Sequence, residues 1–231
     1  MLVSPGGSMR ELPLARCRAE VERLAAERLA SARDEGDLAA LLRDVDAVVT
    51  RALSLAPAPR AACGPGCAAC CTLQVATLPV EGAAIAGFLR LTSAPADLAQ
   101  LARRLDDFQA SVRWLEDRER AQAGFRCPFL DARRACRIHV VRPLACRSVS
   151  SLDAADCADA LGADDEEGPP LVRMNLLQKA LYDDALDAVG EASRRRGLDA
   201  RRRDVAEMTA LFLADPGLAA RHLAGAALPL E

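Results

Sequence analysis

The sequence predicts a mainly α-helical protein in which a helical bundle carries an irregular cysteine-rich segment. Apolar residues recur every three or four positions over several long stretches, as they do on the buried face of an amphipathic helix. The regular alternation of apolar and polar residues that indicates strands is almost absent. The chain has 231 residues, of which 51% are hydrophobic, so it can form a sizeable core without disulfide or metal staples.

Two helices are expected before the first cysteine cluster. They cover about 13–32 and 37–55, each with apolar residues at helical spacing. Cys17 falls on the apolar side of the first helix, so we expect it to be buried like a small hydrophobic residue. Prolines and glycines within 57–66 prevent a continuous helix there and place the first clustered cysteines on a loop.

Two further helices are expected between the two groups of cysteines. The stretch 79–91 begins with a proline, and Glu81 lies where the positive end of the helix dipole favours a negative charge. Ser93 is the expected cap of the next helix, which the apolar spacing extends over 94–123. Trp114 lies within that helix and is expected to pack in the core.

The remaining elements are shorter. The segment 126–157 is expected to form turns, with one brief strand at about 137–141. Further helices close the chain at 171–197, 200–214 and after Pro216. These elements predict an N-terminal helical hairpin at 1–56, a cysteine-cluster domain at 57–160 and a C-terminal helical extension packed on the same core at 161–231.

Composition argues against two classes of partner. The formal net charge is −3, so the chain has no general attraction to phosphate backbones or to anionic membranes. No stretch reaches the roughly 18 apolar residues of a membrane span, and the first residues lack the apolar run of a signal peptide. We therefore expect a cytoplasmic protein without a nucleic-acid or membrane partner.

Eight of the nine cysteines fall within one window of the chain. In a reducing cytosol such a pattern is more typical of a metal or catalytic site than of disulfides, and a bond between the adjacent Cys70 and Cys71 would be strained. Thiolates prefer zinc, copper(I) or iron–sulfur centres over hard cations. The sequence therefore predicts a metal site in this window, whose candidate donors are Cys63, Cys67, Cys70, Cys71, Cys127, Cys136, Cys146 and Cys157.

The spacing of these cysteines is compatible with more than one arrangement. A tetrahedral zinc site takes four donors, typically as two short pairs from separate segments, and eight cysteines suffice for two such sites. Cys67 and Cys70 form one C-x-x-C pair. Spacing alone leaves open which sulfurs meet, and whether they form one polynuclear site or two mononuclear sites. His139 lies three residues after Cys136, where it either joins the site as a nitrogen ligand or only packs.

Six arginines accompany the second group of cysteines, between residues 126 and 147. A divalent metal held by four thiolates carries a negative charge, which nearby positive charge or donated hydrogen bonds stabilise. Arg142 and Arg147 are the strongest candidates for this role because Pro143 and Cys146 hold them close to the cluster. The arginines could also receive an anionic substrate or remain solvated.

Three motifs together resemble the CxxCxxCC family, the YkgJ-type cysteine-cluster proteins associated with zinc or iron chelation. The motifs are CGPGCAACC at 63–71, CPFL at 127–130 and CRIHVVRPLACR at 136–147. A related domain occurs in flagellin lysine N-methylases. The resemblance covers about 63–157 and implies that the eight cysteines of this window are the metal ligands. The family usually has a tyrosine where this chain has His139.

Several functions remain open at this stage. The chain could hold zinc or iron, serve as an iron–sulfur redox or methyl-transfer component, or use zinc structurally to display its helices to a protein partner. Cys63, Cys67 and Cys70 also have the spacing of radical S-adenosylmethionine enzymes, but those enzymes use a partial barrel of strands and helices. No catalytic triad or glycine-rich phosphate loop stands out, so the sequence assigns no enzymatic activity.

Overall fold

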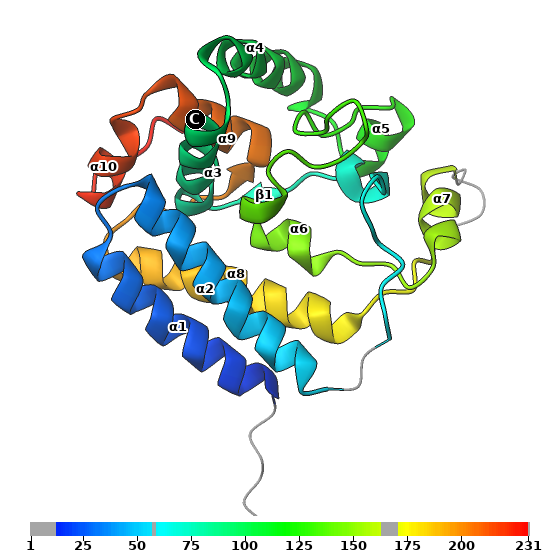
Figure 1. Cartoon of the computed structure of the whole chain (residues 1–231), viewed down its shortest axis with the longest axis horizontal. Coiled ribbons are helices and arrows are strands. Elements are labelled where there is room, and N and C mark those ends of the chain that lie inside the picture. The colour runs from blue at the N-terminus through cyan, green and yellow to red at the C-terminus, as the bar shows by residue number, and fades with distance from the viewer. Residues whose placement is uncertain (1–12, 57–58, 163–170, 231) are drawn as a thin grey trace, which may run out of the picture.

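The computed structural model confirms the mainly α-helical fold class (Figure 1). It describes residues 13–56, 59–162 and 171–230. Within these ranges the chain forms ten α-helices, two short 3₁₀ helices and one two-stranded sheet. None of the helices in the described ranges combines the length and the apolar composition that crossing a membrane requires.

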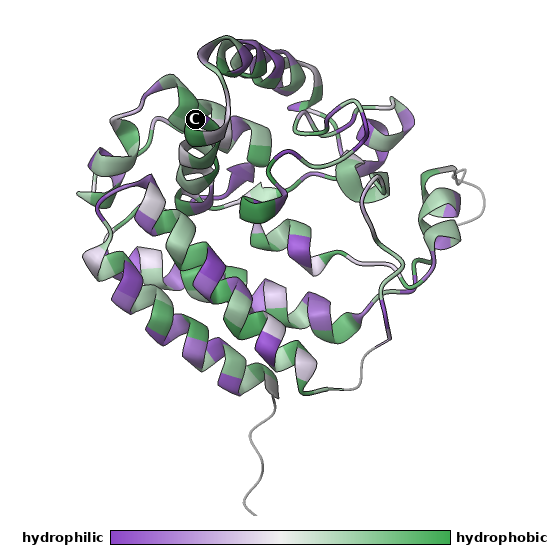
Figure 2. Ribbon diagram, viewed as in Figure 1, coloured by the Kyte–Doolittle hydropathy of each residue, from purple (hydrophilic) through white to green (hydrophobic). Residues whose placement is uncertain are grey.

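Three long helices form one layer of the molecule. They are α1 (Pro13–Ser31), α2 (Glu35–Ser54) and α8 (Leu176–Arg195), which pack side by side (Figure 1). Hydrophilic and hydrophobic residues alternate along α1 and α2 in the manner of amphipathic helices (Figure 2). Cys17 is buried in the core that these helices share, as the sequence predicts.

A second group of helices packs against this layer. α3 (Pro79–Thr92) contacts α2 on one side and α9 (Val205–Ala214) on another, and α4 (Pro95–Val112) also packs on α9. A Cβ atom at Gly82 of α3 would lie 2.3 Å from Cγ of Met208 on α9, so this approach of the two helices requires glycine. The buried residues of α3 and α9 extend the core of the first layer.

Two short elements join distant parts of the chain. β1 (Ala76–Thr77), which follows the first cysteine loop, pairs antiparallel with β2 (Arg203–Asp204), which immediately precedes α9. α10 (Leu218–Leu223) follows α9 and buries His222 against Phe212. The sequence does not predict the small sheet, because two-residue strands are too short to show an alternating pattern.

The single helix predicted over 94–123 is wrong. α4 ends at Val112, and α5 (Asp117–Gln122) begins after a short junction. The side chains of Glu116 and Glu119 form a capping box that starts α5 as a separate helix. Trp114 lies in the junction with 81% of its surface exposed, so the prediction that it packs in the core is also wrong.

Four smaller expectations also need correction. Ser93 ends α3 and does not cap α4, which begins after an alanine. The strand expected at 137–141 is replaced by a 3₁₀ helix, η2 (His139–Val141). The two long helices after residue 170 begin later than the apolar spacing predicts, because the side chains of Asn175 and Asp204 accept backbone N–H groups and cap α8 and α9.

Candidate metal centre

The cysteine-bearing loops surround one cavity of about 570 Å³. Cys157 does not line it. It lies on α7 (Ala154–Gly162), a helix that packs against the 3₁₀ helix η1 (Ala69–Thr72). The other seven cysteines predicted as ligands line the cavity, and they are Cys63, Cys67, Cys70, Cys71, Cys127, Cys136 and Cys146.

The first cysteine loop forms the exposed rim of the cavity. Gly66 adopts a φ of +85°, a conformation that glycine accepts without strain, and Cys67 N donates to the carbonyl of Gly64 at 3.0 Å. Cys63 Sγ accepts a hydrogen bond of 3.4 Å from the backbone N–H of Ser151, in the segment that follows α6 (Leu144–Ser148). These bonds shape a turn that keeps Cys63 and Cys67 at the surface.

Backbone contacts bring the second group of cysteines to the same cavity. Cys127 N donates to the carbonyl of Cys71 at 2.6 Å, which joins the two segments directly. Cys136 forms an isolated β-bridge with Leu130, and the neighbouring Phe129 is fully buried in a core cluster on which Cys127 and Cys136 also pack. Cysteines more than fifty residues apart in the sequence thereby line the same cavity.

A buried carboxylate positions the helix that carries Cys146. Glu81 is fully buried in α3, where Oε2 accepts a hydrogen bond from Leu78 N at 2.9 Å and Oε1 accepts one from Leu144 N at 2.8 Å. Burial raises the pKa of Glu81, although both of these hydrogen bonds favour its ionised form. Leu144 begins α6, so Glu81 anchors this helix against α3. From the sequence, Glu81 is expected only to interact with the positive end of its own helix dipole. Its contact with α6 depends on the fold.

Five of the seven sulfurs affect one another's pKa values, and we call them the inner cysteines, although Cys70 is itself exposed. Burial raises the pKa of Cys127 to about 12 and that of Cys146 well above its ordinary value, and repulsion from neighbouring sulfurs adds to both shifts. The pKa of Cys136 is raised mainly by burial, and that of Cys71 by its hydrogen bond with Cys70. The inner cysteines are Cys70, Cys71, Cys127, Cys136 and Cys146.

Cys70 differs from the other inner cysteines. Its hydrogen bond with Cys71 lowers the pKa of Cys70 to about 6, and the positive charge of Arg142 contributes to the same shift. This shift favours the thiolate form of Cys70. Arg142 lines the cavity, and its charge also lowers the pKa values of Cys136 and Cys146, against the larger effect of burial.

The two arginines singled out in the sequence take different positions. The Nε atom of Arg142 is buried and finds no hydrogen-bond acceptor among the described residues. Arg147 does not line the cavity. Its Nε donates to the carbonyl of Arg142 at 3.2 Å, and its guanidinium pairs with Asp46 of α2 at 3.1 Å. Arg147 therefore supports the backbone that carries Arg142.

Other polar side chains limit which atoms can serve as ligands. His139 lines the cavity, and burial together with the charges of Arg142 and Arg147 lowers its pKa, which favours the neutral imidazole that metals bind. Both carboxylates at the cavity are already engaged. Asp204 binds Arg120 at 2.7 Å, and Asp117 accepts the backbone N–H of Gln74. The donors left for a metal are the thiols and one imidazole, a set that suits zinc or iron.

The sulfurs share a cavity without yet forming a coordination sphere. Within the ranges that the structure describes, no three Cys, His, Asp or Glu side chains stand together as a group that could hold a metal ion. A cysteine sulfur rotates about the single Cα–Cβ bond, so the thiols can turn into the cavity while the backbone stays in place. Metal binding here requires that rotation.

The lowered pKa of Cys70 predicts selective alkylation of the metal-free, reduced protein. The thiolate is the reactive form of cysteine, so iodoacetamide should modify Cys70 with a rate that rises through about pH 6 and levels off near neutral pH. Cys17 is the internal control, since it is buried and its pKa is raised mainly by burial. Mass spectrometry of timed samples shows the order in which the cysteines are alkylated. Modification of Cys17 before Cys70 at pH 7 would contradict the prediction.

Fold and site together define a helical protein with a cysteine cluster suited to soft metal ions. Residues 62–161 match the family model CxxCxxCC, described as "Putative zinc- or iron-chelating domain". This match confirms the resemblance recognised from the three motifs. Comparisons with curated proteins and with solved structures gave no match.

Proposed function

We propose that the protein binds zinc or iron through the inner cysteines. The observation that carries this proposal is the cavity itself, which cysteines from three separate segments line while both nearby carboxylates are engaged by protein groups. Sulfur donors, where no carboxylate oxygen is free, favour zinc or iron over magnesium or calcium. Cys63 and Cys67 at the rim, and Cys157 on α7, complete the ligand set that the family resemblance implies.

Individual residues support this function in different ways. Cys70 supplies a thiolate before any metal binds, and the other inner cysteines release their protons when they bind one. Arg142 offsets part of the negative charge of the sulfurs, while Glu81 and Arg147 hold the backbone on either side of Cys146. The bound metal supplies a crosslink between the loops or, as iron, a centre that carries electrons.

The number of sulfurs favours one further candidate, an iron–sulfur redox or methyl-transfer component. A single tetrahedral ion takes four donors, whereas seven sulfurs line this cavity. An iron–sulfur cluster, or a second metal ion, would use the surplus. The relation to the domain of flagellin lysine N-methylases supports this candidate.

We also propose a cytoplasmic location and the division of the chain at residues 56 and 160. A reducing compartment would keep the nine cysteines as thiols, the state in which the structure describes them. The cysteine-cluster domain 57–160 takes in nearly all of the residues matched by the family model. The flanking helices would then act as the scaffold that holds its loops.

The metal content of the purified protein tests the proposed function. The full chain is purified anaerobically without added metal, and zinc, iron and acid-labile sulfide are measured per chain together with the visible spectrum. One or two zinc ions without sulfide support a zinc site, and iron with matching sulfide supports the iron–sulfur candidate. A folded protein that contains no metal and takes up neither ion when reconstituted would overturn the proposal.

A further inference from the structure

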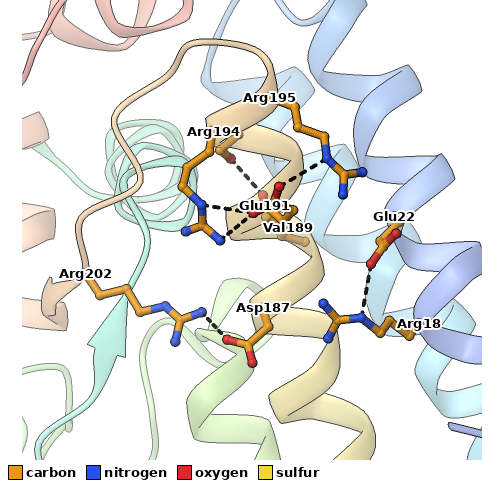
Figure 3. A network of polar contacts seen from close by, with 9 residues as sticks. Arg18, Glu22, Asp187, Val189, Glu191, Arg194, Arg195 and Arg202 are labelled. Atoms are coloured by element: carbon orange, nitrogen blue, oxygen red, sulfur yellow. Dashed lines mark hydrogen bonds and ion pairs between the residues drawn. The ribbon is translucent and has the colours of Figure 1, made fainter. Parts of the chain in front are cut away.

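The two arginines that line the cavity form no ion pair with a carboxylate among the described residues, unlike many arginines elsewhere in the described ranges. In and near α8, Glu191 pairs with Arg194 and Arg195, and Asp187 pairs with Arg202 (Figure 3). In contrast, Arg134 and Arg142 line the cysteine cavity, and neither forms an ion pair within the described residues. The cavity therefore holds two guanidinium groups that no carboxylate of the described residues neutralises.

The carboxylates of the cavity cannot take this role. Asp204 is held by Arg120, and it also accepts the backbone N–H of Ala206 at 2.9 Å. Asp117 is held by the backbone of the first cysteine loop. The buried Nε of Arg142 therefore remains without an acceptor, which is costly for a charged donor unless a ligand supplies one. The natural acceptor for a guanidinium is an anionic oxygen, as in a carboxylate.

The cavity is also larger than a metal ion requires. Sulfur ligands lie only about 2.3 Å from a zinc ion, whereas cavities in the range of about 300–1,000 Å³ hold organic ligands. The volume of about 570 Å³ falls in that range. Val75, Phe108 and Ile138 contribute apolar surface to the lining, which suits the carbon skeleton of an organic molecule. A small organic anion fits beside the cysteines.

We propose that the metal reaches this site as an anionic chelate of a small organic polycarboxylate. Arg134 and Arg142 bind the carboxylates of the chelator while the metal, as cargo, passes to the inner cysteines. This inference rests on the proposed function and specifies the form in which the site receives its metal. It also gives a role to Arg134, a second arginine at the cavity beside the Arg142 that offsets the charge of the sulfurs.

The transfer is a ligand exchange without any change in oxidation state. For each cysteine that binds, one sulfur–metal bond forms and one carboxylate oxygen–metal bond breaks. The thiol proton passes to the released carboxylate or to water, and the metal keeps its charge throughout. Once freed of metal, the polycarboxylate dissociates from the arginines into solvent.

The first test measures binding of citrate, the probe anion, to the reduced and metal-free full chain by isothermal titration calorimetry. Citrate should bind the wild type, and Arg134→Gln should weaken binding about 10-fold or more, as loss of a charge-assisted contact does. Arg43→Gln is the matched control, because Arg43 is an exposed arginine of α2, remote in sequence from the cavity-lining segments. Absence of citrate binding, or equal binding by wild type and Arg134→Gln, overturns the inference.

The second test separates this inference from the proposed function. Zinc offered as its citrate complex should transfer more slowly to Arg134→Gln than to wild type, whereas zinc offered as chloride should reach the same stoichiometry in both. Equal transfer rates from the citrate complex would overturn the chelate inference while the zinc site stands. Failure of the wild type to bind either zinc or iron offered as a simple salt would instead overturn the proposed function, and citrate binding to the metal-free chain would still be measurable.

Discussion

Serine in place of Cys136 is expected to remove most of the bound metal. Cys136 lines the cavity and belongs to the inner cysteines, whose sulfurs affect one another's pKa values. Loss of a residue that merely supports a metal ligand typically weakens binding 10–100-fold, so loss of a ligand should weaken it by about 100-fold or more. Serine is close to cysteine in size, and the β-bridge to Leu130 is made by the backbone, so the loop should keep its shape.

Two other cysteines provide the comparison for this experiment. Cys17→Ser changes a cysteine in the core shared with α8, so the folded variant should keep its full metal content. Cys157→Ser tests the one predicted ligand that does not line the cavity. Metal per chain and competition with a chelator are measured for all three variants. Equal loss of metal in Cys17→Ser and Cys136→Ser would contradict the assignment of the inner cysteines.

Local sequence patterns predicted the helices and the cysteine window because these depend on neighbouring residues. The spacing of apolar residues located α1, α2 and α3 to within a few positions. The same spacing continued through the junction between α4 and α5, and so it hid the break at Trp114. Periodicity reports which face of a helix is apolar, and it is insensitive to a capping box that starts a new helix in the same register.

The composition of the site was predictable, but its internal arrangement was not. Family motifs pointed to eight cysteines, and the structure brings seven of them to one cavity. The separation of the inner cysteines from Cys63 and Cys67 depends on contacts such as the hydrogen bond from Cys127 N to the Cys71 carbonyl. The hydrogen bond from Leu144 N to Glu81 and the ion pair between Arg120 and Asp204 also join segments far apart in sequence. Pairings of this kind arise only when the chain is folded.

Replacing Arg120 by methionine is expected to give the largest loss of stability. Arg120 is 2% exposed, donates to Asp204 Oδ2 at 2.7 Å and also donates to the carbonyls of Val112 and Leu115. Its removal leaves the buried carboxylate of Asp204 without a positive partner, and breaking a buried ion pair in this way costs about 3–5 kcal/mol. Urea denaturation of the metal-free protein measures the free energy of unfolding, so metal affinity does not contribute to the result.

The double variant Arg120→Met, Asp204→Asn identifies the origin of the loss. Asparagine keeps an oxygen that can cap α9, while the uncompensated charge is gone, so the double variant should recover part of the stability. The exposed Arg43 supplies the control, since Arg43→Met should change the free energy of unfolding by less than about 0.5 kcal/mol. If the double variant were less stable than Arg120→Met alone, the loss would come from the contacts of Arg120 with Val112 and Leu115. The ion pair would then contribute little to the position of β2 beside the cysteine cavity.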